Sequence, residues 1–178
     1  NRSGATEEAG PATAHLQWSL SLGYPDPAFD HQYRMCADVT YAPVAAEGLV
    51  FVPSSVTDQV MAYDLAAGTL KWRHTAEGPV RLAPVCRAGK VYFGSDDGYL
   101  RCVSAPDGKL LWKVRGAPDT LPDSRMLVNS RLCSRWPVRG APVEQEGVIY
   151  FGAGIWPEEG VYVCAVNADT GRLLWRSD

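Results

Sequence analysis

The chain has 178 residues, enough to bury one hydrophobic core of ordinary size. Twenty acidic and seventeen basic side chains give a formal net charge of -3, which argues against nucleic acid or an anionic membrane surface as the main partner. No run of apolar residues approaches the roughly 18 that a membrane-spanning helix needs, so no membrane span is predicted. Seventeen glycines and thirteen prolines alternate with short runs of Val, Tyr, Trp and Leu, a pattern typical of many short strands joined by tight turns.

The N-terminal part of the chain begins with a polar stretch, residues 1–14, which predicts a flexible lead-in to one structured segment, residues 15–178. Because the chain does not start with Met, we expect either a processed protein or an excerpt from a longer one. Residues 15–20 resemble a lone outermost strand around Trp18, whose companion strands come from elsewhere. Residues 23–41 follow as a first insertion.

Three repeated units come next, at residues 42–74, 83–115 and 141–178. Each unit begins with Ala-Pro-Val and carries Gly-x-Leu-x-Trp near its end, at Trp72, Trp112 and Trp175. A repeat with a period of about forty residues is typical of propellers and solenoids. A second insertion, residues 115–140, separates the second unit from the third.

The middle unit shows the expected local structure best. Four strands are predicted at residues 85–87, 91–94, 99–104 and 110–114, with turns at Asp97-Gly98 and Asp107-Gly108. Such a unit has two apolar faces and must stack on its neighbours to bury them. The sequence therefore predicts an all-β propeller of four-stranded antiparallel blades, with about three blades present and the ring incomplete. A sandwich or barrel would not require the same turn and the same Trp in every unit.

The end of the third unit, AVNADTGRLLW at residues 165–175, is similar to the tryptophan-docking motif of quinoprotein-like (PQQ-like) β-propeller repeats, a bacterial family. Residues 62–72, AYDLAAGTLKW, and residues 102–112, CVSAPDGKLLW, are degenerate copies of this motif. In that family the Trp lies flat between neighbouring blades and the Gly permits the turn. The resemblance implies these docking roles for Trp72, Trp112, Trp175, Gly68, Gly108 and Gly171.

The second insertion holds candidate binding residues. Arg125, Arg131, Arg135 and Arg139 cluster around Trp136, and such a surface could bind a protein or a small acidic ligand. The alternative, which we favour, is that the arginines are solvated or pair with carboxylates, while Trp136 packs over a blade. The candidate carboxylates are Asp119, Asp123 and Glu144.

Three further features of the sequence bear on possible sites. Trp156 lies in a longer acidic hairpin of the third unit, which is either a contact loop or, as we favour, a wider turn. The three histidines are far apart, so no metal site is predicted. The five cysteines contain no Cys-x-x-Cys pair; Cys36 and Cys133 could form a disulfide, but we expect mainly free, partly buried thiols at Cys36, Cys86, Cys102, Cys133 and Cys164.

The resemblance leaves two functions open. We predict a non-enzymatic scaffold or interaction module of an exported bacterial repeat protein, without a cofactor. The alternative is a fragment of a PQQ-dependent quinoprotein oxidoreductase, which would bind the quinone and calcium. Against that alternative, the chain has no adjacent cysteine pair, and Asp96 and Asp97 lie in a turn that favours Asp for backbone reasons.

The expected partners follow from the number of units. Closed propellers have about four to eight blades, so three units leave an apolar blade face uncovered. We therefore expect further blades from missing sequence, from another chain or from self-association. The resemblance also implies an extracytoplasmic location, in the periplasm or cell envelope.

Overall fold

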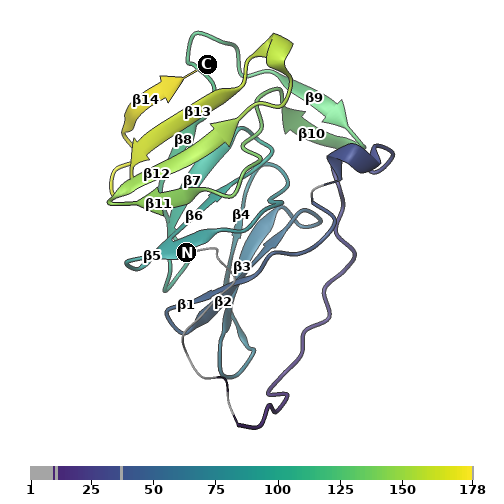
Figure 1. The fold of residues 1–178 in the computed structure, drawn as a ribbon, viewed down its shortest axis with the longest axis vertical. Helices are drawn as coiled ribbons and strands as arrows, with labels where there is room; N and C mark the ends of the chain where they lie inside the picture. Colours follow the sequence, from purple (N-terminus) through teal and green to yellow (C-terminus); the bar gives the residue numbers. More distant parts are fainter. Residues whose placement is uncertain (1–9, 11, 37, 178) are drawn as a thin grey trace.

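The computed structural model describes residues 10, 12–36 and 38–177. Residues 1–9 and 11, most of the predicted lead-in, lie outside this description. The described residues form three four-stranded antiparallel sheets, each with its strands in sequence order, and one two-stranded hairpin. The sheets follow one another from bottom to top in Figure 1, and we call them blades A, B and C.

The strands of each blade follow the repeated units of the sequence. Blade A contains β1 (Val44–Ala46), β2 (Leu49–Ser54), β3 (Gln59–Asp64) and β4 (Leu70–Thr75). Blade B contains β5 (Val85–Arg87), β6 (Lys90–Gly94), β7 (Tyr99–Ser104) and β8 (Leu110–Arg115). Blade C contains β11 (Val143–Gln145), β12 (Val148–Ala153), β13 (Tyr162–Asn167) and β14 (Leu173–Ser177).

The two insertions contain little regular structure. Among its described residues, the first holds one 3-10 turn, η1 (Tyr33–Met35). The second holds the hairpin of β9 (Arg125–Val128) and β10 (Arg131–Ser134), and Figure 1 shows it beside η1. The loop between β12 and β13 contains a second 3-10 turn, η2 (Pro157–Glu159). Residues 15–20, predicted as a lone strand, are not paired with any strand in the described part of the chain.

The first turn of every blade has the same backbone conformation. In blade A, Glu47 and Gly48 have φ of 52° and 75°, and the equivalent pairs of blades B and C also have positive φ. Two consecutive residues with positive φ make a type I′ turn, whose twist matches that of the strands it joins. A register shift between the third and fourth strands also recurs in every blade. The turn sequences thus account for the regular strand lengths.

The hydrophobic core lies between the blades. One cluster joins blade A, through Phe51 and Val60, to blade B, through Val91 and Phe93. A second cluster joins blade B to blade C. The first strands β1, β5 and β11 lie side by side, and the three blades do not close into a ring. The predicted incomplete propeller of four-stranded blades is therefore confirmed. Within the described residues, no helix has the length and apolar character to cross a membrane.

Candidate functional site

The predicted docking residues meet across the boundary between blades A and B. The indole Nε1 of Trp72 donates a hydrogen bond of 2.7 Å to the carbonyl oxygen of Ala105. A Cβ atom on Gly108 would lie 2.6 Å from the Trp72 ring, so only glycine fits beneath the indole. The same pair of contacts joins Trp112 to Ala168 and Gly171, with a hydrogen bond of 3.2 Å, and Trp18 to Leu65 and Gly68, with one of 2.9 Å.

The arginines of the second insertion face different carboxylates rather than one shared surface. The pairs are Arg125 with Glu77 at 2.9 Å, Arg131 with Asp58 and Asp26, Arg135 with Glu159 at 2.9 Å, and Arg139 with Asp96 at 2.7 Å. These carboxylates differ from the three that the sequence suggested, and Glu144 pairs with Arg87 instead. The ion pairs attach the insertion to blades A, B and C and to the first insertion.

The two tryptophans among the candidate binding residues make different contacts. Trp136 is 5% exposed, and its Nε1 donates a hydrogen bond of 2.7 Å to the carbonyl oxygen of Glu159. Trp156 packs edge-to-face on Phe29, with ring centroids 6.1 Å apart. The longer hairpin of blade C therefore rests on both insertions.

A buried cluster of charges surrounds Asp96, in the turn between β6 and β7. Asp96 is 1% exposed and accepts hydrogen bonds of 2.7 Å from Arg81 Nε, Arg139 Nε and Arg139 Nη2. Arg81 also donates to Asp38 Oδ2 at 2.8 Å. Burial opposes the charge of Arg81, but Asp96 and Asp38 outweigh it and hold its pKa above the ordinary value. The cluster ties the first insertion, the segment between blades A and B, and the second insertion to one turn of blade B.

Asp97 fixes the same turn from its other side. Its Oδ1 accepts a hydrogen bond of 3.0 Å from Arg101, and its Oδ2 accepts one of 3.0 Å from the backbone N–H of Glu77. Burial raises the pKa of Asp97, but the hydrogen bonds from Arg101 and Ser95 more than offset it, so the pKa lies below the usual range. The side chain stays ionised and holds the linker that leads from blade A.

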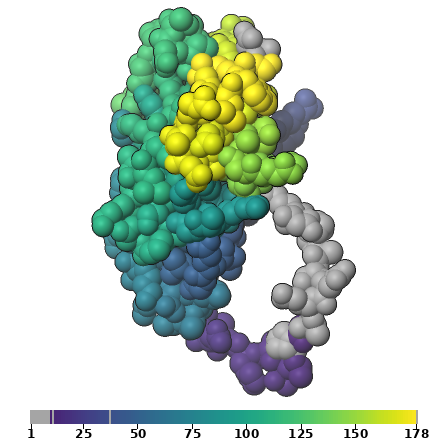
Figure 2. Space-filling model, turned by 90° about the vertical axis from the view of Figure 1, so that its left-hand side faces the viewer, coloured from purple at the N-terminus to yellow at the C-terminus, as the bar shows by residue number. Residues whose placement is uncertain are grey.

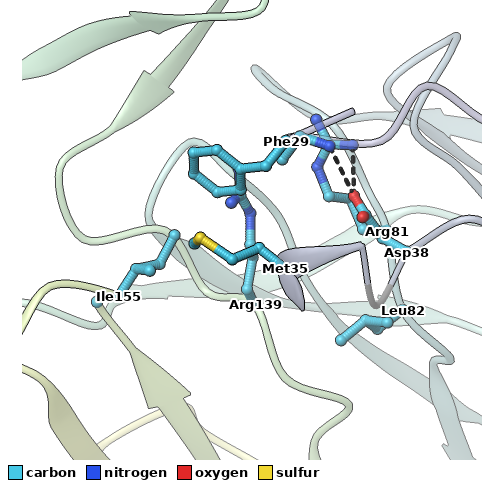
Figure 3. Close-up of a pocket in the computed structure, with 9 residues that line it drawn as sticks. Phe29, Met35, Asp38, Arg81, Leu82, Arg139 and Ile155 are labelled. Atoms are coloured by element: carbon cyan, nitrogen blue, oxygen red, sulfur yellow. Dashed lines mark hydrogen bonds and ion pairs between the residues drawn. The ribbon is translucent and has the colours of Figure 1, made fainter. Parts of the chain in front are cut away.

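A cavity of about 290 Å³ opens beside the Asp96 cluster (Figure 3). Phe29, Met35 and Ile155 form apolar parts of its wall, and Arg81 and Arg139 form part of its polar side. The guanidinium of Arg139 also lies 5.2 Å from the centroid of the Phe29 ring. Each guanidinium already faces a carboxylate, so the cavity presents no net positive charge. Its size and its mixed wall suit a small, largely apolar molecule.

Sequence reasoning identified only part of this cavity. Arg139 was among the predicted binding residues, whereas Phe29, Met35, Asp38 and Arg81 were not. The one available signal was the adjacent pair of acidic residues, Asp96 and Asp97, directly after an apolar strand.

The cysteines are free thiols, and the disulfide considered for Cys36 and Cys133 does not form. Cys36 Sγ instead donates to the carbonyl oxygen of Phe29 at 3.0 Å. Cys133 is buried beside Asp96, and burial raises the pKa of its thiol to about 11. A thiol with so high a pKa is a poor nucleophile at neutral pH, so Cys133 fills space rather than reacting.

Four-stranded blades with side-by-side first strands define the chain as part of a β-propeller. A family model described as outer membrane protein assembly factor BamB matches residues 8–178. The chain belongs to this family of PQQ-like β-propeller repeat proteins.

Individual relatives of the chain are enzymes. The chain is 33% identical over 147 residues to the dehydrogenase subunit of an alcohol dehydrogenase (quinone) from Gluconobacter oxydans (strain 621H). The matched region covers 75% of this chain and 18% of that protein. The chain superimposes on quinohemoprotein alcohol dehydrogenase from Comamonas testosteroni with a TM-score of 0.62 and 26% identity, covering 76% of this chain and 20% of that one. The computationally designed Ika4 protein, with 16% identity, a TM-score of 0.62 and coverage of 93% and 81%, shares the fold alone. The chain thus spans about a fifth of the length of the curated relatives it matches.

These relatives correct two predictions. The expectation of a non-enzymatic scaffold is wrong, because the relatives are quinone and quinohemoprotein alcohol dehydrogenases. The expectation that no cofactor is involved is wrong for the same reason. Both predictions rested on motifs that this chain lacks. The relatives are about five times longer than this chain, so the lack of a motif here says nothing about the rest of such a protein.

The residues of this chain do not by themselves fit a quinone and its metal ion. Within the described residues, no group of three or more His, Cys, Asp or Glu side chains is placed to hold a metal. The sequence has no adjacent cysteine pair. The two arginines of the cavity are neutralised by Asp96 and Asp38, so they offer an anionic quinone little net attraction.

Proposed function

We propose that this chain forms three blades of a quinoprotein-type oxidoreductase, and that blades outside these residues hold the quinone and the metal. The observation that carries the proposal is the 33% identity over 147 residues to an alcohol dehydrogenase (quinone) subunit. The absence of a metal-binding group from the described residues supports the second half of the proposal. The role of this chain is then to build one side of the propeller and to position its neighbours.

The buried ion pairs support this positioning role. Asp96 and its arginines fix both insertions on the face that carries the cavity. A fixed arrangement of this kind suits a wall of a larger site, because paired buried charges resist displacement. We propose an extracytoplasmic location as well, supported by the description of the family as an outer membrane protein assembly factor.

The decisive experiment compares two purified proteins. One is the product of the whole reading frame in which this sequence lies, and the other is the 178-residue chain. Each is incubated with pyrroloquinoline quinone and calcium, and each is assayed for a quinone absorbance band and for alcohol-dependent reduction of an artificial electron acceptor. We expect both signals from the whole product and neither from the chain. A whole product that takes up no quinone would refute the oxidoreductase, whereas uptake by the chain alone would refute the placement of the site.

A further inference from the structure

The cavity beside the Asp96 cluster is assembled from four segments that are distant in the sequence. The first insertion supplies Phe29, Met35 and Asp38, the linker between blades A and B supplies Arg81, the second insertion supplies Arg139, and the loop between β12 and β13 supplies Ile155. Its volume of about 290 Å³ is close to the lower end of the range for small-molecule sites, about 300–1,000 Å³. An apolar cavity of about 150 Å³ takes up benzene, so this one has room for an aromatic ring with substituents.

The wall of the cavity is held in place by contacts among its own segments. Arg81 Nη1 donates a hydrogen bond of 2.8 Å to Asp38, which ties the first insertion to the linker. The ring of Phe29 packs edge-to-face on Trp156 and lies 5.2 Å from the guanidinium carbon of Arg139. A wall that is ordered before a ligand arrives favours binding, because little conformational entropy is then lost on association.

Asp38 carries an uncommitted hydrogen-bond acceptor in this wall. Its side chain is only 9% exposed, and its Oδ2 accepts hydrogen bonds from Arg81 and from the backbone N–H of Ala28, the latter at 3.0 Å. Among the described residues, no donor bonds its other oxygen, Oδ1, and Figure 3 shows the side chain at the edge of the cavity. A buried carboxylate oxygen of this kind gains from a donor on a ligand, because hydrogen bonds to charged groups are the stronger ones. Figure 2 shows the molecule from another side.

The charges around the cavity balance one another. Arg81 pairs with Asp38 and Asp96, and Arg139 pairs with Asp96, so two guanidinium groups face two carboxylates. A charged ligand would add an unpaired charge to this wall, which is costly where water is largely excluded. The wall therefore selects an uncharged molecule that has one donor for Asp38 and an apolar body for the rest of the cavity.

We propose that the cavity binds an uncharged phenol, whose O–H donates to Asp38 Oδ1 while its ring packs against Phe29, Met35 and Ile155. An aromatic ring suits this wall, since aromatic pairs and sulfur–aromatic contacts are favourable beyond the area they bury. A phenol keeps its proton at neutral pH, because its pKa is about 10. The site is built from described residues of this chain, so the inference is independent of the oxidoreductase proposed above.

The test follows the methyl group of Met35 by NMR. The chain has three methionines, so a methyl-labelled sample gives three signals, and Met61, on β3 and outside the cavity wall, is the internal reference. The chain is titrated separately with phenol, with anisole, which lacks the O–H donor, and with benzoate, which is charged. We expect phenol to shift the Met35 signal saturably and to bind at least about tenfold more tightly than anisole, the effect of one hydrogen bond to a charged group. Benzoate should give no saturable shift up to about 10 mM.

Two variants locate the bound phenol. Asp38→Asn removes the charge of the acceptor and should weaken phenol binding by at least about tenfold while leaving anisole binding unchanged. Ile155→Phe fills part of the cavity without touching its ion pairs, and should weaken the binding of both compounds by at least about tenfold. The matched control is Val161→Phe in the same loop, at a position that is exposed and outside the wall, and it should bind phenol as the original chain does.

The outcomes that contradict the proposal are equally specific. A Met35 signal that phenol does not shift saturably up to about 10 mM would overturn the site. Equal affinities for phenol and anisole, or saturable binding of benzoate, would overturn the assigned class of ligand. Phenol binding that survives Ile155→Phe would place the compound outside the cavity. The Met61 signal must keep its position in every variant, which shows that blade A is folded; if Asp38→Asn fails this check, the comparison of phenol with anisole and the Ile155→Phe variant decide.

Discussion

The A–B boundary and the open face of blade C, the face that carries the exposed Trp175, present the same residues in two environments. Trp72 and Trp175 occupy the same place in their blades, but only Trp72 has a neighbouring blade above it. The local sequence thus determines the orientation of each tryptophan side chain, and the neighbouring blade determines how deeply that side chain is buried. Stability in such a repeat array comes largely from the boundaries between units.

The largest expected effect concerns the covered tryptophan. Trp72→Ala should lower the free energy of unfolding by about 3–5 kcal/mol, because it leaves a cavity between two blades and removes the hydrogen bond to Ala105. Urea unfolding followed by circular dichroism measures this loss. A loss below about 1 kcal/mol would mean that the A–B boundary contributes no more than an exposed face.

The A–B boundary also contains the buried charges, which the open face lacks in the described part of the chain. Asp96→Asn keeps the shape of the side chain but leaves Arg81 and Arg139 without their full countercharge. We expect a loss of about 1.5–3 kcal/mol, the range for hydrogen bonds to charged groups. Asp123→Asn, at an exposed position of the second insertion, is the control and should change stability by no more than about 0.5 kcal/mol. Equal effects of the two substitutions would contradict a structural role for Asp96.

A smaller effect should appear in the pH dependence of stability. His74 lies at the A–B boundary, where Nδ1 is 3.0 Å from Gly108 O, and burial lowers the pKa of its imidazole. The unfolded chain therefore takes up the proton first as the pH falls through about 6.5, and stability is lost with falling pH. His74→Gln should flatten the curve between pH 7 and the acid limb, where protonation of Asp97 takes over. Unfolding midpoints measured at pH steps of about half a unit test this, and an unchanged slope would exclude His74 as the cause.

The smallest effect is expected at the open face. Trp175→Ala should cost less than about 1 kcal/mol in this chain, because the side chain is about half exposed and has no blade above it. Urea unfolding, run beside Trp72→Ala, gives the ratio of the two losses. A ratio near one would show that another part of the protein, or another molecule, packs stably on Trp175 in solution.

Much of the fold could be predicted because its signals are local. The strands predicted at residues 99–104 and 85–87 are those observed, and the others of the middle unit differ by one residue at an end. The turns explain this accuracy, since positive φ at Gly89 and Gly108 fixes where strands begin and end. The hairpin of β9 and β10 was not predicted. Its turn residues Asn129 and Ser130 both have positive φ, but neither is the glycine that marks the other turns.

The candidate site could not be predicted in the same way. Asp38, Arg81 and Arg139 meet Asp96 or one another only because blades and insertions fold together across 15 to 43 residues of sequence. Apart from the adjacent Asp96 and Asp97, no local pattern in the sequence indicates such a cluster. The enzymatic relationship was predicted only as the alternative, because the sequence has no adjacent cysteine pair and its acidic pair, Asp96 and Asp97, lies in a turn.

The tryptophan contacts run one way along the chain, each indole packing on a later blade, and this order has a consequence for synthesis on the ribosome. Trp18 leaves the ribosome before blade A, and Trp72 leaves before blade B, so each blade finds its covering indole already made. Translation proceeds from the N-terminus, and domains generally fold in that order. Each described boundary between blades can therefore form as soon as the later blade has been made.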